Sequence, residues 1–397
     1  MKFLHLSDLH LGKIVNERNM IDDQRYMLNK ITEFIVKENV NALLIAGDVY
    51  DKADPPEKAV SLFDEFLLKW SNQNINVLII SGNHDSDVRL DYGKRFFKTH
   101  NIYVAGTYKG NIEKVVLKDE YGPVNFYLMP YIKPSDVDHY FDKDNKSANC
   151  EEAIKKALKN TELDVNQRNV ILSHQSVSFG KNAPELAGSE AIVSVGTIEC
   201  INSSTYDNFD YVALGHFHCS RAVGKENIRY AGSLLKYSQK EATPASFIRT
   251  EDNISPSDKQ FPLVELKEKG SISVEQVYIK PMRDMRCIKG TLKELTALGN
   301  ITAPDDYIYA ILTDEIPQLN AMDAIRDIYP NAMHLEYRNS HTKAIAEFSL
   351  DEKIDEKPFE ETAKNFYSMI MGVNEMPEEE WKILEDIAKE VGILGNL

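Results

Sequence analysis

The sequence predicts an α/β fold, a mixed-sheet sandwich rather than a barrel, followed by a small α+β domain and a C-terminal helical segment. Over residues 1–250, short apolar runs alternate with stretches of helical periodicity. A polar, turn-rich stretch at 250–260 then precedes a second set of short elements. At 397 residues the chain is also too long to fold around one small hydrophobic core, and its length allows two or three domains.

Six apolar runs in the first region are predicted to be buried strands. They are 2–6, 41–46, 76–80, 126–129, 169–173 and 211–214. Between the first two, apolar residues from Ile21 to Ile35 recur mostly at helical spacing. A helix is also predicted over 57–70, because two prolines precede it and its apolar residues mark one face. These strand–helix–strand repeats favour a largely parallel sheet, and the closer spacing of the later strands favours a mixed one.

The second region is predicted to form strands and helices in alternation. The strands are 263–266, 273–279, 307–312 and 333–337, and the helices are 292–298 and 321–329. From Asp351 the chain is acidic and helical, with two amphipathic stripes. They comprise Phe359, Ala363, Phe366, Tyr367 and Ile370, and then Trp381, Leu384, Ile387 and Val391. The predicted domains are therefore 1–255, 262–345 and 351–397.

Composition excludes several classes of protein. No apolar run approaches the roughly 20 residues that span a bilayer. The four cysteines are far apart and form no CxxC pair, which argues against thiolate zinc sites and a disulfide framework and suits a cytoplasmic protein. The net charge of −16 argues against indiscriminate binding of polyanions, although half of it lies in the last 47 residues.

The chemistry is concentrated where predicted strands end. Five strands each deliver a carboxylate, an amide or an imidazole at the carboxyl end, the edge that borders the ligand crevice of an α/β sheet. In chain order these residues are Asp8 and His10, Asp48, Asn83 and His84, His174, and His216 and His218. Four imidazoles, two carboxylates and one amide oxygen suit manganese, iron or zinc better than magnesium or calcium. Seven ligands suit a pair of metal ions, the usual device for hydrolysing phosphoesters.

Each motif alone also has an ordinary structural explanation. Gly47-Asp48 is typical of a turn, and polar residues such as Asp8 and His10 are common in loops. His216-x-His218 at a strand end is more specific, because that alternation suits two metal ligands. The hypothesis of a metal site depends on all five motifs occurring together, each at the end of a strand.

The motifs resemble those of the calcineurin-like metallophosphoesterase superfamily. The matching stretches are SDLHLG at 7–12, GDVYD at 47–51, GNHD at 82–85, SH at 173–174 and GHFH at 215–218. The resemblance implies the four-layer sandwich of that superfamily, with helices outside two sheets. It also implies that Asp8, His10 and His218 hold one metal, that Asn83, His174 and His216 hold the other, and that Asp48 bridges them. His84 is then expected to face the scissile phosphate and protonate the leaving oxygen.

A narrower resemblance covers nearly the whole chain. AGDVYDKADPP at 46–56, YAGSLLKYS at 230–238 and the stretch 307–339 are similar to nuclease subunits of bacterial SbcCD complexes. The resemblance implies a manganese-dependent nuclease for DNA repair and recombination, acting on duplex ends, single strands and hairpins. It further implies a DNA-capping domain at 262–345, a coiled-coil SbcC-like ATPase bound by the C-terminal helices, and a homodimer formed near 57–70 or 85–100. Such a protein is expected in the cytoplasm, associated with the nucleoid.

Two other functions stay open at this point. The chain is alternatively a phosphodiesterase or phosphatase acting on small nucleotides or phosphoproteins, or a non-catalytic clamp for DNA ends whose metals are structural. The C-terminal stripes are alternatively packed on their own domain. The basic residues Arg89, Lys94 and Arg95 are candidates for DNA backbone contact, or form a solvated helix face.

Overall fold

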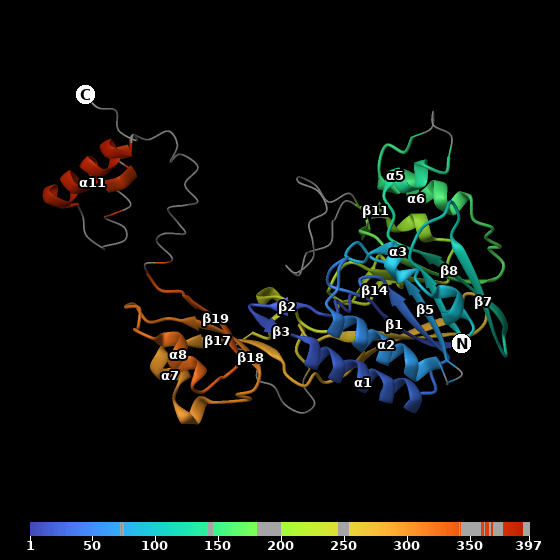
Figure 1. The fold of residues 1–397 in the computed structure, drawn as a ribbon, viewed down its shortest axis with the longest axis horizontal. Helices are drawn as coiled ribbons and strands as arrows, with labels where there is room; N and C mark the ends of the chain where they lie inside the picture. Colours follow the sequence, from blue (N-terminus) through green and yellow to red (C-terminus); the bar gives the residue numbers. More distant parts are fainter. Residues whose placement is uncertain are drawn as a thin grey trace. The chain divides into compact units, whose positions relative to one another are not determined.

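The computed structural model describes residues 1–71, 73, 75–141, 146–180, 200–244, 254–340, 342, 359–360, 362–364, 367 and 376–391. The chain divides into two compact units, Met1–Met285 and Arg286–Leu397 (Figure 1). In the described part of the first unit, two six-stranded sheets dominate, and the second unit is built on a three-stranded sheet. None of the described helices is long and apolar enough to cross a membrane.

The first sheet combines a parallel centre with an antiparallel edge. Its order is β16 (Ile272–Tyr278), β15 (Gln260–Leu266), β1 (Lys2–Leu6), β4 (Ala42–Ala46), β5 (Asn76–Ile80) and β6 (Ile102–Ala105). The last four strands are parallel, whereas β15 runs antiparallel to β1 and β16 antiparallel to β15. α1 (Ile21–Lys37) and α2 (Glu57–Ser71) are the crossovers and contact each other along this sheet (Figure 1). Every residue of β4 is buried, as expected for a parallel strand covered on both faces.

The second sheet has the same mixed character. Its order is β13 (Arg221–Val223), β14 (Lys225–Tyr230), β12 (Tyr211–Gly215), β9 (Arg168–His174), β8 (Gly122–Met129) and β7 (Glu113–Asp119), with β13 and β7 as antiparallel edges. α6 (Cys150–Lys159) packs Ile154 and Ala157 into a core shared with this sheet. The Asn149 side chain caps α6 by accepting from the backbone N–H of Glu152.

The two sheets face each other across an apolar core. Phe3 of β1 lies with its ring centroid 5.9 Å from that of Phe126 on β8 and 5.5 Å from that of Tyr211 on β12. Edge-to-face rings at these distances are favourable beyond the area they bury. Because the helices lie outside the two sheets, the predicted α/β sandwich is confirmed.

Shorter elements complete the first unit. They are α3 (Asp87–Leu90), α4 (Lys94–Lys98), α5 (Pro134–Asp138), β2 (Ile14–Val15) paired with β3 (Arg18–Asn19), β10 (Val177–Ser178) paired with β11 (Ile201–Asn202), and 3₁₀ turns at Ser203–Tyr206 and Gln239–Glu241.

The second unit has a small core of its own. β17 (Met285–Gly290) adjoins β18 (Tyr307–Leu312), which is parallel to β19 (Ala332–Tyr337). The unit also contains α7 (Leu292–Leu295) and α8 (Ala321–Arg326), and a 3₁₀ turn at Leu298–Asn300 follows α7. α11 (Glu378–Glu390) is the last described helix.

One sequence-based assignment of strands differs from the structure. We expected the runs at 263–266 and 273–279 in the second domain, but β15 and β16 extend the first sheet beyond β1, and the division falls after Met285. Val264 and Leu266 are buried in the core between the two sheets, which is why β15 pairs with β1. The predicted helix at 292–298 is also shorter, as α7 ends at Leu295. Phe366 and Ile370 of the first C-terminal stripe lie outside the described residues.

Candidate metal centre

The turns after β1 and β4 run side by side. The backbone N–H of Asp8 donates to the carbonyl of Gly47 at 3.0 Å, and that of His10 donates to the carbonyl of Asp48 at 3.0 Å. Asp8, His10 and Asp48 have φ angles of 50°, 45° and 50°, in a region that residues with a Cβ seldom adopt. Such strain persists only where the surrounding structure fixes it, and it is concentrated at functional sites.

Three glycines allow the strand ends to approach this closely. A Cβ on Gly47 would lie 2.3 Å from Nδ1 of His174, and one on Gly215 would lie 2.6 Å from the same atom. A Cβ on Gly82 would lie 2.1 Å from Oδ1 of Asp48. The glycines next to the site residues are therefore required because the space of a side chain is already occupied.

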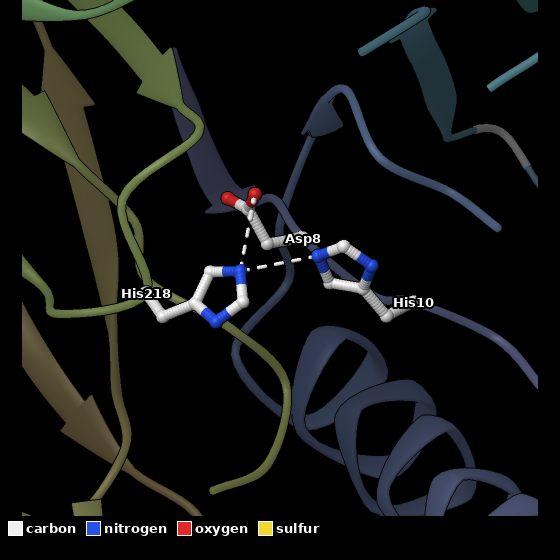
Figure 2. A group of neighbouring side chains, drawn as sticks. All are labelled: Asp8, His10 and His218. Atoms are coloured by element: carbon white, nitrogen blue, oxygen red, sulfur yellow. Dashed lines mark hydrogen bonds and ion pairs between the residues drawn. The ribbon is translucent and has the colours of Figure 1, made fainter. Parts of the chain in front are cut away.

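A first cluster consists of Asp8, His10 and His218 (Figure 2). Nε2 of His10 lies 3.1 Å from Nε2 of His218, which lies 3.9 Å from Oδ1 of Asp8. All three residues are buried, and the Ser7 hydroxyl donates to Oδ2 of Asp8 at 2.5 Å. Two facing imidazole nitrogens beside a carboxylate make a mixed nitrogen and oxygen donor set.

A second cluster consists of Asp48, Asn83, His174 and His216. Oδ1 of Asn83 lies 3.1 Å from Nε2 of His174 and 3.0 Å from Nδ1 of His216. Oδ2 of Asp48 lies 3.4 Å from Nε2 of His174 and 3.6 Å from Nε2 of His10. Asp48 therefore lies between the two clusters, and the structure brings all seven predicted ligands together.

Burial and charge shift the pKa values of these groups strongly. Burial raises the pKa of Asp8 to about 8, whereas burial and then the charge of His174 lower the pKa of His216 to about 3. Burial also disfavours the charged forms of Asp48 and His174, but their mutual attraction prevails, lowering the pKa of Asp48 and raising that of His174 to about 9. A buried carboxylate among imidazoles is an environment that favours a cation. The donor set, its burial and the position of Asp48 fit two divalent metal ions.

His84 lies beside these two clusters, in a third group with His10 and Asp51. Its Nδ1 lies 2.9 Å from the carbonyl oxygen of Asp51, and because a carbonyl only accepts, Nδ1 carries the proton of that bond. Its backbone N–H donates to Oδ1 of Asp48 at 2.8 Å, and its ring lies edge-on to that of His10, with centroids 4.9 Å apart. Nε2 is consequently the ring nitrogen left for a ligand of the site.

Gln24 is a residue of this site that the sequence did not reveal. It is buried on α1, and its Nε2 donates to the carbonyl of His10 at 2.8 Å and to the Tyr237 hydroxyl at 3.0 Å. Its Oε1 accepts from the backbone N–H of Gly12 at 3.0 Å, and the Tyr237 hydroxyl donates to the carbonyl of Leu9 at 2.7 Å. A glutamine inside an amphipathic helix carries no signal in the sequence that separates it from a solvated one.

Asp85 is the other unassigned residue, although it ends the GNHD motif. Its carboxylate accepts from the backbone N–H groups of Val49 at 3.1 Å, Tyr50 at 2.9 Å and Gly82 at 2.9 Å. Burial, with the nearby charge of Asp48, raises its pKa to about 6. Asp85 therefore ties together the turns after β4 and β5 that carry Asp48 and Asn83.

Comparison with known proteins gives two matches to family models. Residues 1–220 match calcineurin-like phosphoesterase, and residues 281–370 match type 5 capsule protein repressor C-terminal domain. A relative from Staphylococcus epidermidis, the D subunit of the nuclease SbcCD, is 28% identical over 370 residues, which cover 92% of this chain and 93% of the relative.

Two solved structures are more distantly similar. A dimetal phosphatase from Danio rerio is 12% identical, with 71% of this chain and 98% of its own covered and a TM-score of 0.40. GAP50, the anchor in the inner membrane complex of Plasmodium, is 12% identical, with 85% of this chain and 96% of its own covered and a TM-score of 0.38.

The first family match covers more than half of the chain and contains all eight site residues predicted from the sequence. The family resemblance carried by the five motifs is thereby confirmed. With two adjacent clusters of buried metal-binding side chains at the ends of its strands, the chain belongs to the calcineurin-like phosphoesterase family and is a hydrolase of phosphate esters.

Proposed function

We propose that this protein is a manganese-dependent DNA nuclease, the nuclease subunit of an SbcCD-like complex for DNA repair and recombination. The observation that carries the proposal is similarity to a nuclease subunit over 92% of this chain, combined with the buried donor set. The proposed substrates are duplex ends, which it shortens as an exonuclease, and single strands or hairpins, which it cuts internally. We place this activity in the cytoplasm, at the nucleoid.

The roles of the site residues follow from the two clusters. Asp8, His10 and His218 would hold one ion and Asn83, His174 and His216 the other, with Asp48 placed to contribute to both. When bound, such ions supply Lewis-acid activation of water and neutralise the phosphoryl oxygens. Gln24 and Asp85 form hydrogen bonds with the backbone of the turns that carry the metal-binding residues, and these bonds keep the metal-binding side chains oriented.

His84 is the proposed proton donor. The bond from its Nδ1 to the Asp51 carbonyl fixes the ring and leaves Nε2 to protonate the leaving oxygen. A positioned acid of this kind contributes roughly 10²–10⁴-fold to a rate.

Docking of the ATPase is assigned to α11. Ile383, Ile387 and Val391 recur every four residues at this helix and are all exposed. An apolar stripe of this spacing suits the helices at the base of a coiled coil. Trp381, which begins the predicted second stripe, instead packs within its own unit, because its ring centroid lies 6.3 Å from that of Phe359.

Contact with the DNA backbone is assigned to Arg95, which is exposed on α4. The other two candidates are engaged in ion pairs, Arg89 with Asp54 and Lys94 with Glu113. The Arg89 pair is exposed and therefore weak, so Arg89 remains able to exchange Asp54 for a phosphate, whereas Lys94 is partly buried and also pairs with Asp91.

The test is a gel assay of end-labelled linear duplex with purified protein and its ATPase partner in manganese. We expect cleavage that chelator abolishes and that His84→Ala reduces about 100-fold or more. Manganese binding measured by calorimetry should be unchanged in His84→Ala, and exposed His100→Ala is the matched control. Intact DNA together with rapid hydrolysis of p-nitrophenyl phosphate would contradict the nuclease and indicate an enzyme for small phosphate esters.

A further inference from the structure

A cavity of about 380 Å³ lies beside the second metal cluster. Its wall includes Tyr131, whose ring lies edge-on to that of His174 with centroids 6.3 Å apart. The backbone N–H of Tyr131 donates to the carbonyl of Ser81 at 2.9 Å, just before the turn that carries Asn83. One residue thus forms a wall of the cavity and flanks the metal centre. The volume falls within the range typical of small-molecule sites, about 300–1,000 Å³.

The lining of this cavity is rich in aromatic rings. Tyr108, Tyr131, His139 and Tyr140 all contribute to it. The rings of Tyr108 and Tyr140 meet edge to face, with centroids 5.8 Å apart. Exposed faces of tyrosine in a groove are the surfaces on which proteins stack the bases of single strands.

The Tyr108 hydroxyl is a buried polar group of a residue in the lining. Tyr108 is 6% exposed, and its hydroxyl has no hydrogen-bond partner among the described residues. Burial, with Tyr140 nearby, raises its pKa to about 12, so the group is a donor at neutral pH. A buried hydroxyl is costly when unpaired, and because its oxygen is covered in this structure, a small movement of the Tyr108 ring would bring it to a ligand acceptor in the cavity.

Charge at the cavity indicates which part of a nucleotide enters it. Asp87 and Asp136 belong to the lining, so a phosphate would meet two like charges. A nucleobase is uncharged, stacks on aromatic rings, and presents carbonyl oxygens and ring nitrogens as acceptors. Its exocyclic amino groups are donors that a carboxylate such as Asp87 accepts.

We propose that this cavity binds one unpaired nucleobase of the DNA strand whose phosphate lies at the metal centre. The proposal rests on the proposed function and extends it, because it gives the enzyme a preference for frayed ends and single strands. Tyr131 and Tyr140 stack on the base, and Tyr108 donates to one of its acceptors.

The first experiment measures binding of the full-length protein in chelator, where no cleavage occurs. Fluorescence anisotropy compares a labelled single-stranded 12-mer with the same oligonucleotide made wholly of abasic residues, which has the same phosphates. We expect about tenfold tighter binding of the base-bearing strand, in keeping with stacking on tyrosine. Tyr131→Leu and Tyr140→Leu should each reduce this ratio severalfold, whereas Tyr121→Leu, at the turn between β7 and β8, should not.

The second experiment measures turnover in manganese. Two substrates are compared, single-stranded DNA and bis(p-nitrophenyl) phosphate. In Tyr140→Leu, turnover of DNA relative to turnover of the small diester should fall about tenfold, because only DNA carries a base. Equal binding of both strands by the natural protein, or an unchanged ratio in both cavity variants, overturns the proposal. Tyr108→Phe tests the hydroxyl alone and should weaken binding of the base-bearing strand without affecting the abasic one. Failure of the nuclease would appear differently, as absent cleavage with the binding preference intact.

Discussion

The turn after β1 keeps Asp8 and His10 in a backbone conformation that residues with a Cβ avoid, and Gln24 supplies hydrogen bonds that hold it. Gln24 contacts the backbone of the turn and the Tyr237 hydroxyl, so its contribution is to position His10. Partners that orient metal ligands typically change metal affinity or activity by 10–100-fold.

We therefore expect Gln24→Met to weaken manganese binding at least tenfold, as measured by calorimetry. Turnover at saturating metal should fall by a smaller factor than the metal affinity. Asn169→Leu is the matched control, because it removes another buried amide with hydrogen bonds, at the start of β9. If both variants lost metal affinity equally, general destabilisation rather than positioning would be the cause.

Gly215 allows a test of how closely the strand ends pack at the metal centre. A Cβ there would lie 2.0 Å from the carbonyl oxygen of Ala46, a backbone atom that cannot swing away as a side chain would. We expect Gly215→Ala to lower the free energy of unfolding by about 3 kcal/mol or more, measured by urea denaturation. Gly299→Ala, where an added Cβ has no neighbour within 4 Å, should change it little.

At the scale of elements, one ion pair joins the far ends of β7 and β9. Arg168 is buried, and its Nη1 donates to Oδ2 of Asp119 at 3.0 Å. Burial acts to raise the pKa of Asp119, but the guanidinium of Arg168 and the amino terminus of Met1 prevail, and the pKa falls to about 2, from an ordinary value of 3.8. Because the folded state holds its proton less tightly than the unfolded chain, ionised Asp119 stabilises the fold above about pH 4.

This stabilisation should be lost as the pH falls from about 4 to 2. The expected size is about 2 kcal/mol, obtained from urea unfolding at a series of pH values. Asp119→Asn should lack this step and be less stable than the natural protein at pH 7. A difference between the two proteins that does not vary between pH 2 and pH 5 would contradict the assignment.

The sequence predicted where strands occur better than it predicted which strands pair with each other. The runs from β1 to β12 that end in site residues were recognisable because parallel strands are apolar on both faces. β15 and β16 were recognised as strands but assigned to the wrong unit, since an apolar run does not specify which edge it will cover. Asp8, His10 and the other predicted site residues were singled out because five such motifs occur together, each at a strand end, and the structure brings them close to one another. Gln24 was missed, because its function depends on contacts distant in sequence.

At the scale of the whole molecule, an exposed apolar surface marks the proposed dimer contact. Val88, Tyr92 and Phe96 recur every four residues across α3 and α4 and are 68%, 84% and 79% exposed. Aromatic residues are enriched at the centres of protein interfaces, and single-molecule surfaces seldom leave several adjacent ones uncovered. The predicted pairing region at 85–100 contains this surface, and we propose it as the site of dimerisation.

We expect the natural protein to sediment as a dimer, and the double variant Tyr92→Asp and Phe96→Asp to sediment as a monomer at the same concentration. Two carboxylates in a buried interface are costly, and here they would face their copies. Tyr121→Asp places the same charge on another exposed tyrosine and should leave the dimer intact. An unchanged sedimentation coefficient in the double variant would locate the contact elsewhere, with 57–70 as the next candidate.

The metal centre takes its residues from both sheets of the first unit. Strands β1, β4 and β5 precede Asp8, His10, Asp48 and Asn83, whereas β9 ends with His174 and β12 precedes His216 and His218. Cutting the chain between β6 and β7 would therefore give two fragments that each carry half of the metal centre. The two fragments would still be able to pair, because β15 of the second fragment is the partner of β1 of the first. Neither fragment alone would hydrolyse a phosphate ester. Hydrolysis regained on mixing would then signal that the fragments had met, which makes this fold a candidate split-enzyme reporter for the association of any two proteins fused to its halves.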